Sequence, residues 1–95
     1  MTDAASHPEH DLPAVDFSTF ILSLVHSALV HLGDAPQPGS EHHVEPHLPL
    51  ARQTIDLLSI LQEKTRNNLT GEEERLLDQA LFDLRMRFVE VSRKT

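Results

Sequence analysis

Histidine is the residue type in this chain best suited to chemistry, because imidazole binds metal ions and exchanges protons near neutral pH. Seven histidines occur in 95 residues, and His42, His43 and His47 lie close together with Glu41 and Glu45 among them. Imidazole and carboxylate groups can together bind zinc, nickel or copper. A specific site also needs ligands held in fixed geometry, and this stretch is broken by proline and glycine. We therefore keep these three histidines as weak metal-ligand candidates, and we favour a polar linker that holds no metal.

Catalytic arrangements are not indicated by the remaining polar residues. The chain contains no cysteine, which excludes a thiolate nucleophile, a thiolate metal site and a disulfide. Acid–base catalysis needs a positioned pair of groups in a pocket. Asp56 and Glu63 lie two turns apart on one predicted helix, and the acids 72–74 are better explained as the start of another. The sequence thus predicts a protein that is not an enzyme and needs no cofactor.

The charge distribution argues against nucleic-acid binding. The formal net charge is −7, and all eight lysines and arginines lie in residues 50–95. No basic surface is therefore expected that would attract phosphates. A helix-turn-helix would place the start of its second helix in the major groove. Here that start carries Glu72, Glu73 and Glu74, which phosphates would repel.

Three stretches of helical periodicity must position all of these side chains. Apolar spacing predicts helices over about 17–32, 49–66 and 71–92. We expect residues 1–15 to be a disordered tail and residues 33–48, with three prolines and two glycines, to be a mobile linker. The predicted fold class is all-α: one small helical domain over residues 16–95, in which the first helix packs across a hairpin of the other two.

Clear boundary signals support these helices. Asp16 is placed to cap the first helix, Gly33 to stop it, and Pro49 suits the first position of the second helix. Thr70 followed three residues later by Glu73 is the pattern of a capping box, in which each side chain bonds the other residue's backbone N–H. Thr70 and Glu73 are therefore predicted to be structural caps at the corner between the second and third helices.

Three segments resemble a bacterial family known as domain of unknown function 1844. They are residues 17–33, residues 51–78 and residues 84–89, and the most distinctive parts are Gln-Glu-Lys-Thr at 62–65 and Asn-Leu-Thr-Gly-Glu-Glu-Glu at 68–74. The resemblance covers about Phe17 to Val91. It implies no reaction, cofactor or substrate. The histidine-rich stretch 41–47 departs from the family pattern, so any property of those histidines would be particular to this chain.

Surplus apolar surface is the feature with the clearest functional meaning. The third helix carries a heptad-like seam from Leu77 to Val91 and a second apolar row beside it, and the first helix is apolar around more than half its circumference. A three-helix unit of this size can bury about one row per helix. We expect a homodimer whose interface uses the apolar residues left outside these rows, which are Leu22, Val30, Phe82, Met86 and Val89.

We therefore predict a non-enzymatic helical interaction or scaffold module that self-associates and can also bind a further protein partner. One alternative is a metal-handling protein that uses the linker histidines. Another is a peripheral membrane protein that uses the first helix as an interfacial element, although no lysine or arginine flanks that helix. Its apolar run, residues 17–33, is at or below the length that spans a bilayer and contains polar residues. Because we see no signal-peptide pattern, a cytoplasmic location is expected.

Overall fold

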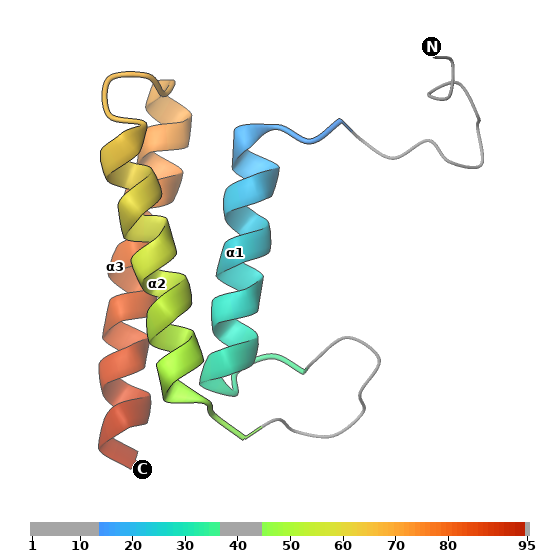
Figure 1. Ribbon diagram of the computed structural model, residues 1–95, viewed down its shortest axis with the longest axis vertical. Helices are drawn as coiled ribbons and strands as arrows, with labels where there is room; N and C mark the ends of the chain where they lie inside the picture. The colour runs from blue at the N-terminus through green and yellow to red at the C-terminus, as the bar shows by residue number, and fades with distance from the viewer. Residues whose placement is uncertain (1–13, 37–44, 95) are drawn as a thin grey trace, which may run out of the picture.

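The computed structural model describes residues 14–36 and 45–94, and within these ranges it contains three α-helices and no strand (Figure 1). The helices are α1 (Phe17–Leu32), α2 (Leu48–Lys64) and α3 (Gly71–Lys94). The all-α prediction is confirmed. α1 has the expected bounds, α2 begins one residue earlier and ends two residues earlier than expected, and α3 extends two residues further. Most of the predicted tail lies outside the described residues, as do His42 and His43 in the predicted linker.

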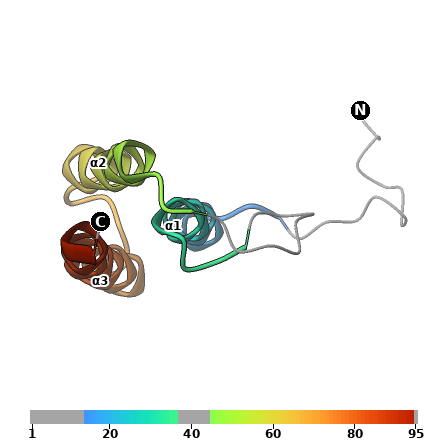
Figure 2. The same ribbon diagram turned by 90° about the horizontal axis from the view of Figure 1, so that it is seen from below.

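The helices lie side by side, with α2 antiparallel to α1 and α3 (Figure 1). Seen along their axes, they occupy the corners of a triangle, so that each helix packs against both of the others (Figure 2). Residues 65–70 connect α2 to α3 at one end of the molecule, and the end of α3 lies near the end of α1 at the other (Figure 1).

Local hydrogen bonds explain where the helices begin and end. The Asp16 carboxylate accepts the Thr19 N–H at 2.8 Å, and Gly33 ends α1 in the left-handed conformation with φ 84°. α2 starts at Leu48 because His47 acts as its N-cap: the His47 Nδ1 accepts the Leu50 N–H at 3.3 Å. Pro49 therefore occupies the second helical position, where its missing N–H is equally harmless.

The corner between α2 and α3 has both hydrogen bonds of a capping box. The Glu73 N–H donates to the Thr70 hydroxyl oxygen at 3.1 Å, and the Thr70 N–H donates to the Glu73 Oε1 at 2.9 Å. Asn67 has φ 68°, a left-handed conformation that asparagine tolerates better than most residues. This local chemistry turns the chain through the sharp reversal that sets α3 beside α2.

The core lies along the shared axis of the three helices. It consists of ten buried residues: Ile21, Ala28, Leu32, Ala51, Ile55, Leu58, Leu77, Leu81, Leu84 and Val91. The predicted seam of α3 supplies four of these, and its fifth member, Phe88, is partly buried against them.

α2 presents only part of its apolar surface to the core. Ala51, Ile55 and Leu58 are buried against the other helices, whereas Leu50 and Leu57 are exposed. The small side chain of Ala51 allows the neighbouring helices to come close. Thr54 is buried on the same side at little cost, because its hydroxyl donates to the Leu50 carbonyl at 3.0 Å.

The prediction that Val30 belongs to the exposed apolar surface is wrong, because Val30 is only 8% exposed. After Gly33 the chain leaves α1 and then returns to the same end of the helix, where the His47 N–H donates to the His31 carbonyl at 2.7 Å. Val30, in this last turn of α1, is buried but does not belong to the helix–helix core.

Candidate interaction surface

The second apolar row of α3 lines a surface groove, which we call the α3 groove. Phe82, Met86 and Val89 are 60%, 51% and 48% exposed and line an open depression of about 700 Å³. The buried side chain of Leu81 also contributes to its lining. These three are the only members of the predicted interface that the structure brings together. Leu22 is also exposed, but it lies on α1 and does not line the groove.

Helical geometry explains why these side chains escape the core. Phe82 follows the core residue Leu81, and Val89 follows the seam residue Phe88, so each is rotated by about 100° from the residue before it and points away from the core. Met86 continues the row four residues after Phe82 and three before Val89. Arg87 lies on a different side of α3 from Phe82, Met86 and Val89. Its side chain contacts Asp34, just after the end of α1. α3 therefore has two adjacent apolar faces, and contact with α1 and α2 uses one of them.

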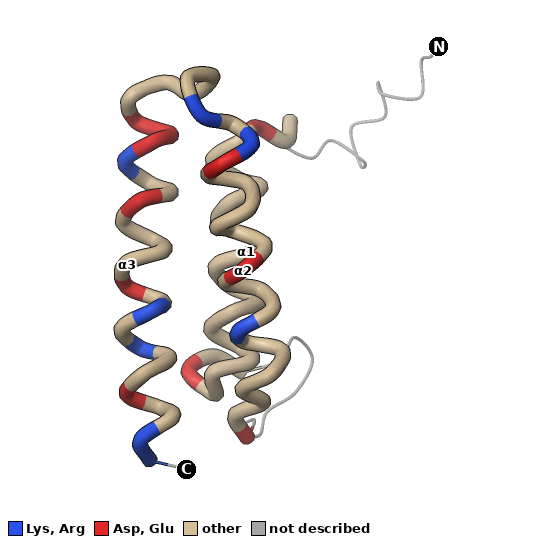
Figure 3. The backbone as a smooth tube through the Cα atoms, turned by 60° about the vertical axis from the view of Figure 1, so that its left-hand side comes forward, with Lys and Arg blue, Asp and Glu red and all other residues tan. Residues whose placement is uncertain are grey.

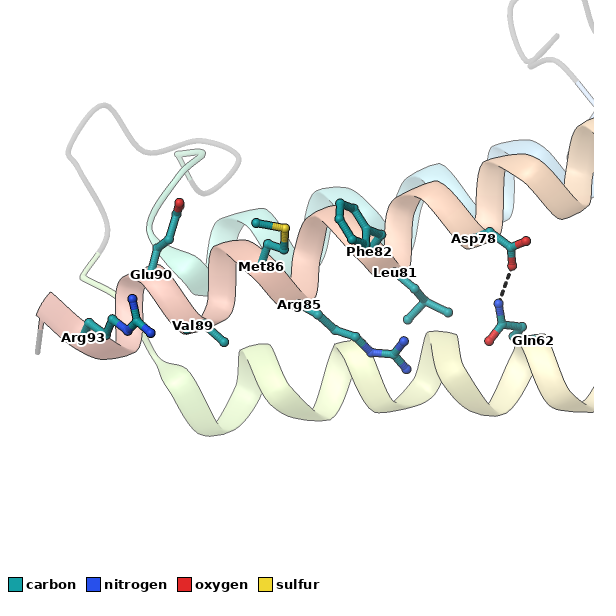
Figure 4. Close-up of a pocket in the computed structure, with 9 residues that line it drawn as sticks. All are labelled: Gln62, Asp78, Leu81, Phe82, Arg85, Met86, Val89, Glu90 and Arg93. Carbon is teal, nitrogen blue, oxygen red and sulfur yellow. Dashed lines mark hydrogen bonds between the residues drawn. The ribbon is translucent and has the colours of Figure 1, made fainter.

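Polar contacts to α2 form one wall of the groove. The Gln62 amide of α2 donates to the Asp78 carboxylate of α3, and the Arg85 Nη2 donates to the Ser59 hydroxyl at 3.2 Å. Figure 4 shows Arg85 extending toward α2, whereas Phe82 and Met86 project away from it. These contacts join α2 and α3 along this wall of the groove.

Charges of opposite sign mark the two ends of the groove. Asp78 lies at its N-terminal end and Arg93 at its C-terminal end, with Glu90 at the rim. Glu90 is engaged within the chain, because its carboxylate accepts the Arg87 Nη1 at 3.1 Å. Figure 3 shows both signs of charge along α3, whereas the residues of α1 itself carry none. The groove is thus an apolar strip bounded by charges that could set the direction of a partner.

Two ionisable side chains hold the ends of α1. The Arg87 guanidinium contacts the Asp34 carboxylate through Nε at 2.6 Å and Nη2 at 2.8 Å, and this hydrogen bonding raises the pKa of Arg87. At the other end, the backbone N–H of Thr19 lowers the pKa of the Asp16 carboxyl by stabilising its charged form. Both contacts stabilise the ends of α1, and neither Arg87 nor Asp16 lines the α3 groove.

The metal-ligand candidates are not brought together in the part of the chain that the structure describes. Within residues 14–36 and 45–94, no three histidine, aspartate or glutamate side chains are grouped as a metal site would need. His47, the one candidate in these ranges, caps α2 through its Nδ1. Thr70 and Glu73 are engaged with each other's backbone.

Sequence reasoning did not find the polar side chains of the groove, Asp78, Arg85 and Arg93. The helical periodicity did indicate them, because all three lie within about 100° of the Phe82–Val89 row around the axis of α3. The sequence did not show that α2 supplies hydrogen-bond partners for two of them, Asp78 and Arg85.

Three packed helices without a strand in the described ranges define a small all-α protein. A family model described as Domain of unknown function (DUF1844) matches residues 14–90, and the chain belongs to this family. The match includes α1, α2 and nearly all of α3. No curated protein and no solved structure gives a significant match. None of the helices described is both long and apolar enough to cross a membrane.

Proposed function

We propose that this protein is a non-enzymatic helical interaction module that self-associates through the α3 groove. The observation that carries the proposal is the row of Phe82, Met86 and Val89, three large apolar side chains that remain about half exposed in one depression. Clustered exposed apolar residues bordered by charges are typical of protein–protein contact surfaces. α1 and α2, which pack side by side with α3, support this row from behind.

Burial of the apolar row supplies part of the free energy that a dimer needs. Full burial of a large apolar side chain contributes about 1.5–3 kcal/mol, so covering the exposed half of each contributes about 0.8–1.5 kcal/mol. Six such side chains across a two-fold contact contribute about 5–9 kcal/mol. Association itself costs roughly 4–15 kcal/mol. Burial of the apolar row alone therefore falls short of the roughly 8 kcal/mol that a micromolar dissociation constant requires, and contacts at the groove rim must supply the rest.

The proposed interface is confined to α3. Leu22 lies outside the groove, and Val30 is buried, so α1 offers no apolar row continuous with Phe82, Met86 and Val89. An interface confined to α3 is a specific contact, which differs from nonspecific association through any exposed apolar residue.

A matched pair of variants tests this proposal. Met86 lines the groove and Ile60 on α2 does not, although both are 51% exposed and both lie within helices. Gel filtration with light scattering over about 5–500 µM should show concentration-dependent dimerisation in the wild type and in Ile60→Asp, and its loss in Met86→Asp. Far-ultraviolet circular dichroism should show unchanged helix content. Equal weakening by both substitutions would exclude the α3 groove as the interface.

The alternatives drawn from the sequence have less support. The apolar row of α1 that a membrane-surface helix would need, which includes Ile21, Ala28 and Leu32, is buried against α2 and α3. A metal role would rest on His42 and His43, which lie outside the described residues, and on His47, which acts as a helix cap. A non-catalytic role in the bacterial cytoplasm, without a cofactor, stays a prediction from the sequence.

A further inference from the structure

The α3 groove has a self-complementary order of side chains. Phe82 and Val89 lie at equal distances along α3 from a midpoint between Arg85 and Met86. Asp78 and Arg93 lie at equal, larger distances from the same midpoint, about 11 Å to each side at 1.5 Å per residue. The groove is thus acidic at one end, apolar within and basic at the other end.

We propose that the occupant of the groove is the α3 helix of a second copy of this chain, running antiparallel, with the two-fold axis passing between Arg85 and Met86. This proposal rests on the proposed self-association and adds the geometry of the contact. In this arrangement Phe82 packs against the partner's Val89, and Asp78 faces the partner's Arg93. The same two contacts recur on the other side of the axis, as an isologous interface requires.

The charges select this orientation over the parallel one. A parallel pair in register would place Asp78 against Asp78, Arg85 against Arg85 and Arg93 against Arg93. Like charges opposed across an interface are unfavourable, and complementary ones favour both orientation and encounter. At the centre, each Met86 lies beside the partner's Arg85, whose aliphatic stem can cover the methionine while its guanidinium stays on Ser59.

The charged side chains at the two ends of the groove are available for contact with a second copy. One oxygen of the Asp78 carboxylate accepts the Gln62 amide, which orients the group and leaves the second oxygen available for a guanidinium. Arg93 forms no ion pair with any residue in the described ranges. Glu90, the other acid at the rim, is held by Arg87 of its own chain and so competes little for Arg93. Little rearrangement is therefore required when the two copies meet.

Charge reversal at the two ends tests the orientation. Asp78→Arg places like charges at both ends of an antiparallel pair, and so does Arg93→Asp. Each single substitution should raise the dissociation constant at least about tenfold, because two attractive pairs become repulsive. The double variant Asp78→Arg/Arg93→Asp restores both pairs and should return the dissociation constant to within about threefold of the wild type. A parallel pair would show no such rescue, since its like charges would persist.

Disulfide trapping provides a second measurement that does not depend on charge, because the chain has no cysteine of its own. An equimolar mixture of Phe82→Cys and Val89→Cys chains should form a crosslinked heterodimer under mild oxidation. Phe82→Cys alone should not crosslink, because the two residues 82 would lie about 10 Å apart along the axis, too far for a disulfide. Crosslinking of Phe82→Cys alone, or no rescue by the double charge variant, would overturn the antiparallel contact while leaving self-association intact. A wild type that stays monomeric would overturn self-association itself, and selective binding of a different helical protein to the monomer's groove would identify another occupant.

Discussion

Removing the Thr70 hydroxyl should destabilise the protein, since that oxygen accepts the Glu73 N–H in the first turn of α3. In Thr70→Ala the reciprocal bond from the Thr70 N–H to the Glu73 carboxylate can persist, because it uses the backbone. The substitution therefore removes one of the two capping bonds. α3 is the longest helix and supplies four of the ten core residues, so fraying at its start weakens the attachment of α2 as well.

The expected loss is about 1 kcal/mol in the free energy of unfolding, within the range of about 0.5–2 kcal/mol for replacing threonine at an N-cap by alanine. For a domain of this size, 1 kcal/mol corresponds to a decrease in Tm of about 4–8 °C. Thr70→Ser keeps an oxygen at the same position and should stay within about 2 °C of the wild type by the same conversion.

Thermal unfolding followed by circular dichroism, at a protein concentration low enough to keep the chain monomeric, provides the assay. Glu73→Ala removes the other half of the capping box, and the double variant should cost less than the two single variants summed if the bonds support each other. An unchanged Tm for Thr70→Ala, or an equal decrease for Thr70→Ser, would refute the capping assignment.

Three further outcomes follow from the packing and the charges. Leu58→Ala should cost about 2–5 kcal/mol in urea denaturation, and Leu57→Ala about 1 kcal/mol or less, because Leu58 is buried and Leu57 is exposed; equal losses would show that the α2 register is different. Asp16 has a lowered pKa in the folded state, so its contribution to stability is present above the unfolded pKa of about 4 and is lost as pH falls further. The protection of the Thr19 amide, relative to its intrinsic exchange rate, should fall in that range in the wild type, and Asp16→Asn should lack this pH dependence. Arg87→Lys loses the two-point contact to Asp34, so amide exchange at residues 33–34 should accelerate while the exchange of core amides in α3 stays unchanged; no local change would remove the structural role of this ion pair.

Local signals in the sequence were sufficient for the helix boundaries of α1 and for the corner before α3. Asp16, Gly33 and the Thr70–Glu73 pair act on backbone groups within four residues of themselves, so no distant partner is needed to foresee them. The α3 seam was equally readable, because its row from Leu77 to Val91 keeps strict 4-3 spacing.

The features that could not be foreseen depend on distant parts of the chain. Apolar residues surround more than half of α2, so the sequence alone does not show that Ala51 and Leu58, not Leu57, face the neighbouring helices. Val30 is buried near the end of α1, to which the chain returns at His47, and that return is not visible in the local sequence pattern. The wall of the α3 groove includes Asp78 and Arg85, whose hydrogen bonds go to Gln62 and Ser59 of α2, which are distant in the sequence.

Sedimentation equilibrium of the wild-type chain tests self-association through the α3 groove most directly. The monomer mass is 10.7 kDa. We expect the weight-average mass to rise toward twice that value between about 5 and 500 µM, with a micromolar dissociation constant, and the Met86→Asp chain to keep the monomer mass throughout. A wild type that stays at the monomer mass across this range, or a Met86→Asp chain that dimerises as readily, would contradict the central role of the groove.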